Sequence, residues 1–256
     1  MALNLDFVGK PIEAIPFSYD RDSVIRYALG IGIGTDGDDL DFVYEKRLKV
    51  FPAFATIPFI RVFMEKLLPI ANIDLVSLLH GEHRVVLLNP IPNEGTVYTT
   101  LVWEAVFDKG DTGALLRLST LTRDSGGEPL FENQALFVDR SAGHFGGHRG
   151  PKAHWTATPD DIQPAFRASL DTAPHQAALF RLSGDKNPLH IDPDFAQRAG
   201  FDRPILHGLC SFGFACRAVL TKCCGNDPRR LKRFGTRFVN AVYPGDTLTT
   251  EGWHGH

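Results

Sequence analysis

Two stretches of the chain carry the apolar spacing of amphipathic helices. The first is Phe54–Leu68, and the second is Gly208–Lys222. In the second, apolar side chains recur every three or four residues, as expected of one buried helix face. This predicted buried face comprises Leu209, Phe212, Cys216, Val219 and Cys223.

Other stretches alternate apolar and polar residues, which is typical of half-buried strands. Three of them follow one another as Thr96–Lys109, Ala114–Arg123 and Pro129–Arg140. Ser125–Glu128 contains two glycines and supplies a tight turn between the last two. We therefore expect three successive antiparallel strands in the first part of the chain.

An internal repeat indicates how these elements are organised. Asn89–Thr100 is echoed by Asn240–Thr250, and each copy follows one of the two helical stretches. Self-similarity at this length predicts a duplicated unit. Strands with one long helix per half predict an α+β fold in which each sheet wraps around a helix. We expect an N-terminal half at 1–140, a linker rich in Gly, His and Pro at 141–164, and a C-terminal half at 165–256.

The second half is shorter than the first. Two strands are expected after Thr100, whereas only six residues follow Thr250. The second sheet should therefore lack two strands. Either the natural chain continues beyond this sequence, or the sheet has an exposed edge. We favour continuation, because unpaired strand edges promote aggregation.

Composition limits the possible classes of protein. Hydrophobic residues make up 43% and charged residues 22%, as in ordinary globular domains. The net charge of −3 argues against a nucleic-acid partner. No apolar run approaches the ~20 residues of a membrane span, and Met1–Lys10 lacks a signal-peptide layout. We expect neither nucleic acid nor membrane as a partner.

The cysteines indicate the redox environment. All four fall on or just after the second helical stretch, where buried thiols are more plausible than a disulfide framework. They are Cys210, Cys216, Cys223 and Cys224. The sequence therefore predicts an intracellular, reducing compartment.

The segment Leu182–Pro193 holds the clearest candidate chemistry. Asp185 and His190 flank a stiff Asn187-Pro188 pair, because proline fixes its own φ and restricts the residue before it. A carboxylate and an imidazole that hold a water between them form a general acid/base pair. An Asx/Pro turn with a surface histidine is the alternative. Asp192 and Pro193 then predict the N-cap and first residue of a helix.

Gly208 opens the second helical stretch and could supply an electrophilic group. A helix N-terminus has free N–H groups and a positive dipole end, which stabilise an oxyanion. Glycine there lets a ligand approach the backbone. The preceding His207 is more plausible as a buried hydrogen-bonding histidine than as a proton donor. We expect no metal site, because the nearby His, Asp and Cys residues lack standard ligand spacing.

The chain resembles the MaoC-like (R)-specific enoyl-CoA hydratases, also called hydratase 2. The resemblance is carried by Leu182–Pro193 and Phe201–Phe214. It continues in order along nearly the whole chain. The other matching segments are Tyr27–Gly32, Phe42–Glu45, Leu79–Glu82, Asp108–Gly110, Phe145–Gly147 and Arg237–Gly245.

The resemblance implies a double hot-dog fold and syn addition of water to trans-2-enoyl-CoA, giving (3R)-3-hydroxyacyl-CoA without a cofactor. It assigns catalysis to Asp185, His190 and Gly208, with one site per chain. The first half lacks this motif and is expected to accommodate the acyl chain. The expected substrate-binding residues are His80, Gly81, Lys109, Lys186, Asn187, Pro188, Leu189 and Phe238. Glu45 and His207 are expected in supporting roles.

Several alternatives remain open at this point. The same site could serve a 3-hydroxyacyl-thioester dehydratase in synthesis, since one site catalyses both directions. A non-catalytic acyl-CoA-binding hot-dog module would have no reason to keep Asp185 and His190. A thioesterase would need its water aimed at C1 instead of C3. We also expect a homodimer, which would be cytoplasmic in a bacterium and peroxisomal in a eukaryote.

Overall fold

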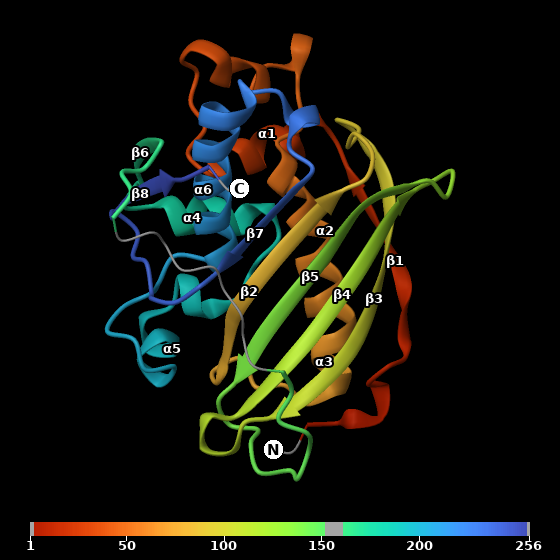
Figure 1. Cartoon of the computed structure of the whole chain (residues 1–256). Coiled ribbons are helices and arrows are strands. Elements are labelled where there is room, and N and C mark those ends of the chain that lie inside the picture. Colours follow the sequence, from red (N-terminus) through yellow and green to blue (C-terminus); the bar gives the residue numbers. More distant parts are fainter. Residues whose placement is uncertain (1–2, 152–160, 255–256) are drawn as a thin grey trace.

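The computed structural model describes residues 3–151 and 161–254. A six-stranded sheet of order β1-β3-β4-β5-β2-β7 dominates the fold, and β6 and β8 form a separate two-stranded sheet (Figure 1). All the strand pairs are antiparallel. The strands are β1 (Pro11–Tyr19), β2 (Leu78–Leu87), β3 (Gly95–Asp108), β4 (Ala114–Asp124), β5 (Pro129–Asp139), β6 (Phe166–Asp171), β7 (Arg233–Arg237) and β8 (Thr247–Gly252).

The three strands predicted in the first half are present as β3, β4 and β5, with ends within one residue of the prediction. Alternate residues of β5 are buried, as the pattern required. The turn between β4 and β5 is closed by the Asp124 carboxylate, which accepts hydrogen bonds from the N–H groups of Gly126 (2.8 Å) and Glu128 (2.9 Å). The turn chemistry therefore fixes the hairpin register.

The predicted helix at Phe54–Leu68 exists, but its winding changes along its length. It comprises α2 (Thr56–Val62), a π turn at Phe63–Leu67 and α3 (Leu68–Ala71). Pro69 has no N–H, so the regular bond to the carbonyl four residues earlier cannot form there, and a π turn precedes it. α2 packs against β1 and β3, and Phe63 stacks on Phe137 of β5 at 4.7 Å.

The second predicted helix is α6 (Gly208–Cys224), which ends at Gly225 in the left-handed conformation. The prediction that Cys223 lies on the buried face is wrong: Cys223 is exposed and Cys224 is buried. At 3.6 residues per turn the buried face passes from Leu220 to Cys224. All four cysteines are free thiols, and the other three are buried.

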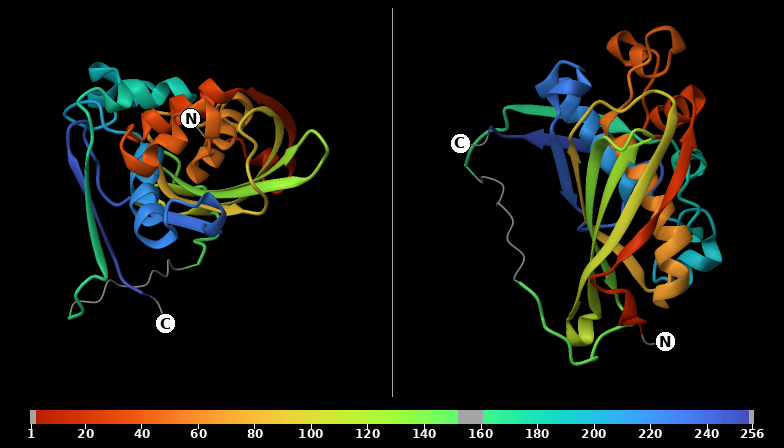
Figure 2. Two further views of the ribbon diagram at one scale, coloured as in Figure 1. Left: turned by 90° about the horizontal axis from the view of Figure 1, so that it is seen from above. Right: turned by 90° about the vertical axis from the view of Figure 1, so that its right-hand side faces the viewer.

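The second half repeats the plan of the first with fewer strands. β6 pairs with β8 as β1 pairs with β3, and α6 packs against both strands. β7 joins the edge of the large sheet through β2. Figure 2 shows β6 and β8 lying apart from the large sheet. Within residues 161–254 no strands correspond to β4 and β5.

The two halves also meet through their smaller helices. α1 (Arg21–Gly30) contacts α4 (Gln176–Phe180), and the Gln176 amide donates to the carbonyl oxygen of Gly30 at 2.7 Å. Of the predicted linker, 152–160 lies outside the described residues. Over the ranges that the structure describes, no helix has the length and apolarity needed to cross a bilayer.

Candidate active site

The loop between α4 and α5 (Pro193–Arg198) is held by successive side-chain caps. The Asp185 carboxylate accepts from the N–H of Asn187, and the Asn187 side chain accepts from the N–H of Leu189, both at 3.1 Å. Pro188 then begins a short 3-10 turn that ends at His190. The predicted stiff bend is therefore present, and its conformation is set by local residues.

The helix that follows begins as the sequence predicts. The Asp192 carboxylate accepts from the N–H groups of Asp194 (2.9 Å) and Phe195 (3.3 Å), and Pro193 is the first helical residue. This cap fixes the chain immediately after His190.

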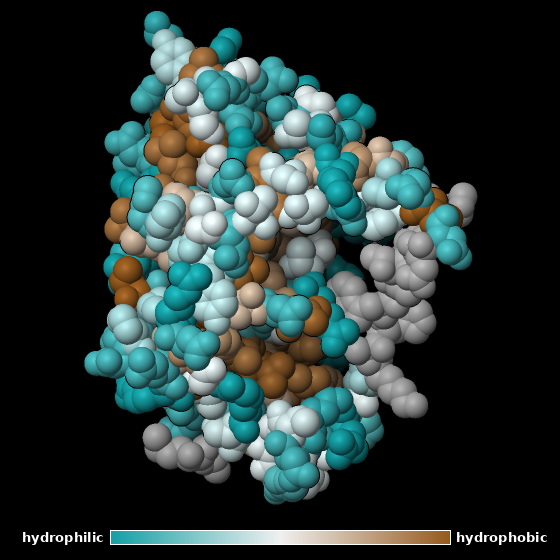
Figure 3. All heavy atoms as spheres, turned by 90° about the vertical axis from the view of Figure 1, so that its left-hand side faces the viewer, coloured by the Kyte–Doolittle hydropathy of each residue, from teal (hydrophilic) through white to brown (hydrophobic). Residues whose placement is uncertain are grey.

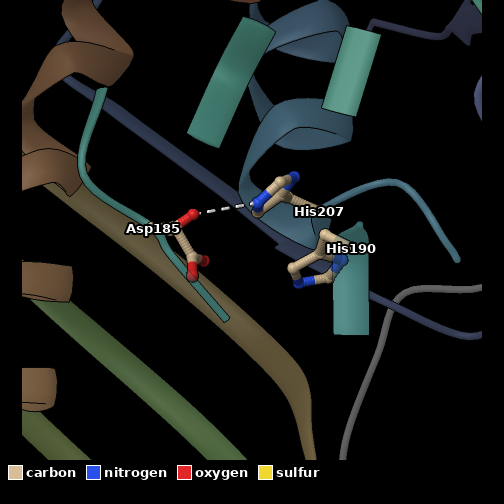
Figure 4. Close-up of side chains that lie close together, drawn as sticks. All are labelled: Asp185, His190 and His207. Atoms are coloured by element: carbon tan, nitrogen blue, oxygen red, sulfur yellow. Dashed lines mark hydrogen bonds between the residues drawn. The ribbon is translucent and has the colours of Figure 1, made fainter. Parts of the chain in front are cut away.

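Asp185 and His190 come together in a nearly closed environment, each 8% exposed. The nearest carboxylate oxygen and ring nitrogens of Asp185, His190 and His207 all lie within 4.8 Å of one another (Figure 4). Among the described atoms, the Asp185 carboxylate and the His190 ring share no direct hydrogen bond. One water molecule can bridge a separation of this size.

Backbone contacts select the tautomer of His190. Its Nδ1–H donates to the carbonyl oxygen of Ile205 at 2.9 Å, which leaves Nε2 as a proton acceptor. Burial lowers the pKa of His190 below its ordinary value, while the negative charge of Asp185 and the Ile205 carbonyl oppose that shift. His190 is therefore neutral near pH 7 and able to accept a proton.

His207 is fully buried behind this pair. Its Nε2–H donates to the backbone carbonyl of Asp185 at 3.2 Å, and its ring stacks on that of His190 at 3.7 Å. Burial, and then the neighbouring His190, hold the pKa of His207 well below its ordinary value. The neutral His207 ring thus contacts both Asp185 and His190, and its supporting role stays a prediction.

The N-terminus of α6 lies beside the pair. The N–H groups of Cys210 and Ser211 donate to the carbonyl oxygen of His207 at 3.0 and 3.1 Å. The N–H of Gly208 has no hydrogen-bond partner among the described residues. A side chain at Gly208 would meet the Phe238 ring at 3.4 Å. Gly208 lines the cavity, and an N–H donor there can serve an oxyanion.

These groups open into a cavity of about 320 Å³ built by both halves of the chain. The second half contributes Asp185, His190 and Gly208, and the first half contributes apolar side chains. The apolar contributors include Ile60, Phe63, Met64, Leu75 and Leu78. On the face that carries α5, β6 and β8, the surface is hollowed and hydrophobic side chains gather in the hollow (Figure 3). A polar reacting group and an apolar chain could both be accommodated in such a cavity.

The residues that were expected to bind substrate fall into two groups, those that line the cavity and those that do not. Those that line the cavity are His80, Gly81, Asn187, Leu189 and Phe238. Those that do not are Lys109, Lys186 and Pro188, and the proposed supporting residue Glu45 also lies outside it. Lys186 and Glu45 are exposed. Roles for these four remain predictions without a contact in the cavity.

Lys109 belongs to a separate turn at the end of β3. Its ammonium donates to the carbonyl oxygen of Arg149. The adjacent Asp108 carboxylate accepts from the N–H groups of Gly110, His144 and Gly146 at 2.7–2.9 Å. These backbone donors, Gly110 first, lower the pKa of Asp108 to about 2. The turn is thus held by an ionised aspartate.

Asp185, His190 and His207 also form a group whose side chains could ligate a metal ion, within the described part of the chain. The two imidazole rings are stacked, with 28° between their planes. Ring nitrogens bind metals in the plane of the ring, so stacked rings aim poorly at a common centre. We therefore interpret the group as an acid/base site.

Comparisons with known proteins identify the family of the chain. Two family models match the chain: the MFE-2 hydratase 2 N-terminal domain over residues 17–140, and the MaoC like domain over residues 156–256. "Probable enoyl-CoA hydratase 2" of Dictyostelium discoideum is 41% identical, over 96% of this chain and 85% of the relative. The chain belongs to the MaoC-like hydratase 2 family.

Two further proteins are similar to the chain over most of their length. "Enoyl-CoA hydratase 2, peroxisomal" of Arabidopsis thaliana is 37% identical, over 93% of this chain and 82% of the relative. The crystal structure of a MaoC-like dehydratase from Phytophthora capsici is 31% identical and has a TM-score of 0.84, over 98% of this chain and 88% of that one. A protein of Mycobacterium tuberculosis described as having a double hot-dog fold is 15% identical and has a TM-score of 0.59, over 95% of this chain and 83% of that one, so the predicted double hot-dog fold is confirmed.

Sequence reasoning missed two buried polar residues near the cavity, His83 and Asn133. His83 is 1% exposed and Asn133 is fully buried. Asn133 occupies an inward position of β5, between Phe131 and Ala135. The sequence itself could have indicated this residue, because a polar side chain among the apolar inward positions of a strand must find a buried hydrogen-bond partner.

Proposed function

We propose that this protein hydrates trans-2-enoyl-CoA to (3R)-3-hydroxyacyl-CoA in fatty acid metabolism, without a cofactor. The observation that carries the proposal is the cavity in which Asp185, His190 and the Gly208 N–H meet apolar side chains of the other half. The family's enoyl-CoA hydratase 2 members support the same reaction.

In the proposed mechanism, one water molecule lies between the Asp185 carboxylate and Nε2 of His190. Its oxygen bonds to C3 while the pair takes up its proton. The π electrons move toward the thioester, whose oxygen gains charge and accepts from the Gly208 N–H. Return of a proton from the pair to C2 on the same face completes syn addition.

The two halves have different roles in this proposal. Residues 165–256 supply the reacting groups, whereas residues 1–140 supply an apolar wall through Ile60, Met64 and Leu75. The segment 141–164 joins them. Binding of the acyl chain by one half and chemistry in the other would explain why a single motif serves two hot-dog units.

A spectrophotometric assay tests the reaction. Incubation with crotonyl-CoA and with a long-chain enoyl-CoA should lower the absorbance of the conjugated double bond. An (R)-specific 3-hydroxyacyl-CoA dehydrogenase should then reduce NAD⁺ with the product, and an (S)-specific one should not. Strong NADH formation with the (S)-specific enzyme would contradict the stereochemical assignment.

The same site would catalyse dehydration of a 3-hydroxyacyl thioester, so the physiological direction depends on which thioester is supplied. A non-catalytic binding module is disfavoured because Asp185 and His190 are both present and share the cavity.

We further propose a homodimer, which light scattering can test. A peroxisomal location is proposed for a eukaryotic source, after the Arabidopsis relative.

A further inference from the structure

A buried polar chain connects the start of α2 to the wall of the cavity. The Asn133 amide nitrogen donates to the carbonyl oxygen of Ala55 at 3.1 Å. Asn133 Oδ1 lies 2.9 Å from Nε2 of His83, and Nδ1 of His83 lies 3.3 Å from Nε2 of His80. This series of buried polar residues thus ends at His80, which lines the cavity.

A β-bulge makes this arrangement possible. Residues three apart on a regular strand point to opposite faces of the sheet. The pairing of β2 with β5 shifts register between His80 and Glu82, which inserts Gly81 as an extra residue. His80 and His83 therefore both face the interior. The carbonyl oxygen of Gly81 accepts from the N–H of Phe238 at 2.8 Å, so the bulge also holds the second half.

The hydrogen-bond directions follow from one fixed acceptor. The Ala55 carbonyl can only accept, so Asn133 must direct its amide nitrogen there and its oxygen to His83. Neutral His83 then carries its proton on Nε2, and its Nδ1 faces Nε2 of His80, whose ring also has the backbone of Glu82 as a hydrogen-bond partner. Burial supports the neutral form, because it lowers the pKa of His83 to about 4.

The position of the His80 ring affects the reacting end of the cavity. This ring stacks on Phe137 at 4.3 Å and lies 5.1 Å from the Phe238 ring. Phe238 in turn borders Gly208. A rotation of His80 would therefore remove the support of Phe238 beside the Gly208 N–H.

We propose that His83 and Asn133 are positioning residues that hold His80 in the cavity wall, and so control acyl-thioester binding beside Gly208. The inference rests on the proposed function for the identity of its ligand. His83 is itself packed between Phe59 of α2 and Phe212 of α6, at 4.9 and 5.5 Å, so its ring can be replaced by another of similar shape.

The test uses His83→Phe, which keeps the ring and removes both hydrogen bonds. KM for crotonyl-CoA should rise about five- to tenfold, the effect of losing the one hydrogen bond that reaches His80 from His83, while kcat changes less than about twofold. His83→Gln has a donor and an acceptor and should stay near wild type. An unchanged KM in folded His83→Phe would overturn the proposal.

A double variant separates positioning from stability. His83→Phe with Asn133→Leu removes the polar pair together and should recover much of any lost Tm, yet keep the raised KM. Recovery of KM in step with Tm would show a purely structural role. If His83→Phe alone does not fold, KM can still be measured in the double variant, and an unchanged KM there would also overturn the proposal.

Binding of butyryl-CoA, measured by calorimetry, distinguishes failure of this inference from failure of the proposed function. His83→Phe should weaken butyryl-CoA binding about five- to tenfold whether or not the wild type turns over an enoyl-CoA. Wild-type protein that binds butyryl-CoA without hydrating crotonyl-CoA would refute the reaction alone. Equal butyryl-CoA affinity in wild type and variant would refute the positioning role.

Discussion

The two halves share a topological plan but differ in what their central helices offer the cavity. In the first half, α2 and the π turn present apolar side chains such as Ile60 and Met64. In the second half, α6 presents the backbone N–H of Gly208, which has no partner within residues 3–151 and 161–254, next to the loop that holds Asp185 and His190. The difference teaches that two halves with a shared plan of helix and sheet can line one cavity with different groups, apolar side chains from one half and polar groups from the other.

The largest effect should come from removing the proposed reacting groups of the second half. Asp185→Asn and His190→Ala should each lower kcat by about 10²–10⁴-fold, the usual contribution of general acid/base catalysis. Both variants should remain folded and bind acyl-CoA. Steady-state hydration of crotonyl-CoA checks this. More than about a tenth of wild-type activity in either variant would show that Asp185 and His190 are not the catalytic acid/base pair.

Gly208→Val should have the next largest effect. A branched side chain would push against Phe238 and crowd the thioester, lowering kcat by about 10²–10³-fold, the scale of one oxyanion donor. Tm should change little, because glycine is itself a poor helix former. Gly208→Ala is the matched control, since its Cβ meets Phe238 only at ordinary contact distance. Wholesale unfolding of Gly208→Val would indicate close packing instead.

A larger side chain in the part of the cavity that the first half lines should change the preferred length of the acyl chain. Met64 lines the cavity and is half-buried, so Met64→Trp should block a long acyl chain. We expect kcat/KM for a decenoyl-CoA to fall about tenfold, with crotonyl-CoA little affected. Met64→Leu should behave as wild type. Equal losses for both substrates would place the acyl chain elsewhere.

The smallest effect concerns acid stability, in which the buried histidines and Asp108 act over different pH ranges. Unfolded His83 takes up a proton near 6.5, whereas the buried ring resists protonation until about pH 4. The unfolded state therefore binds more protons, and stability falls as the pH drops through that window. Asp108 acts in the same direction between about 3.8 and about 2.

Thermal unfolding as a function of pH measures both contributions. His83→Gln should flatten the decline in Tm between pH 6.5 and 4, and Asp108→Asn should flatten it below pH 3.8. Each kcal/mol lost from the free energy of unfolding should lower Tm by about 2–4 °C for a chain of this size. Identical pH profiles for wild type and both variants would contradict these assignments.

The elements that could be predicted from sequence are those whose signal is local. Alternation located β3, β4 and β5, and three-and-four spacing located α6. The bend between Asp185 and His190 was predictable because the caps that fix it lie within a few residues. The exposed Cys223 was mispredicted because a coarse spacing rule drifts from the true period over four turns.

Features that depend on contacts distant in sequence were not predictable in this way. The apolar wall joins Ile60 and Leu75 to a loop more than a hundred positions away. The bulge at Gly81 turns His80 and His83 to the same face, which period-two alternation would exclude. Such features become visible only when the sheet register is known.

The separate roles of the two halves are tested most directly by the binding of decanoyl-CoA, a saturated thioester that cannot be hydrated, to two variants, measured by calorimetry alongside crotonyl-CoA turnover. Asp185→Asn should bind decanoyl-CoA with nearly wild-type affinity and fail to hydrate crotonyl-CoA. Met64→Trp should hydrate crotonyl-CoA normally and bind decanoyl-CoA about tenfold more weakly. If either variant loses binding and turnover together while remaining folded, chemistry and acyl-chain binding are not divided between the two halves.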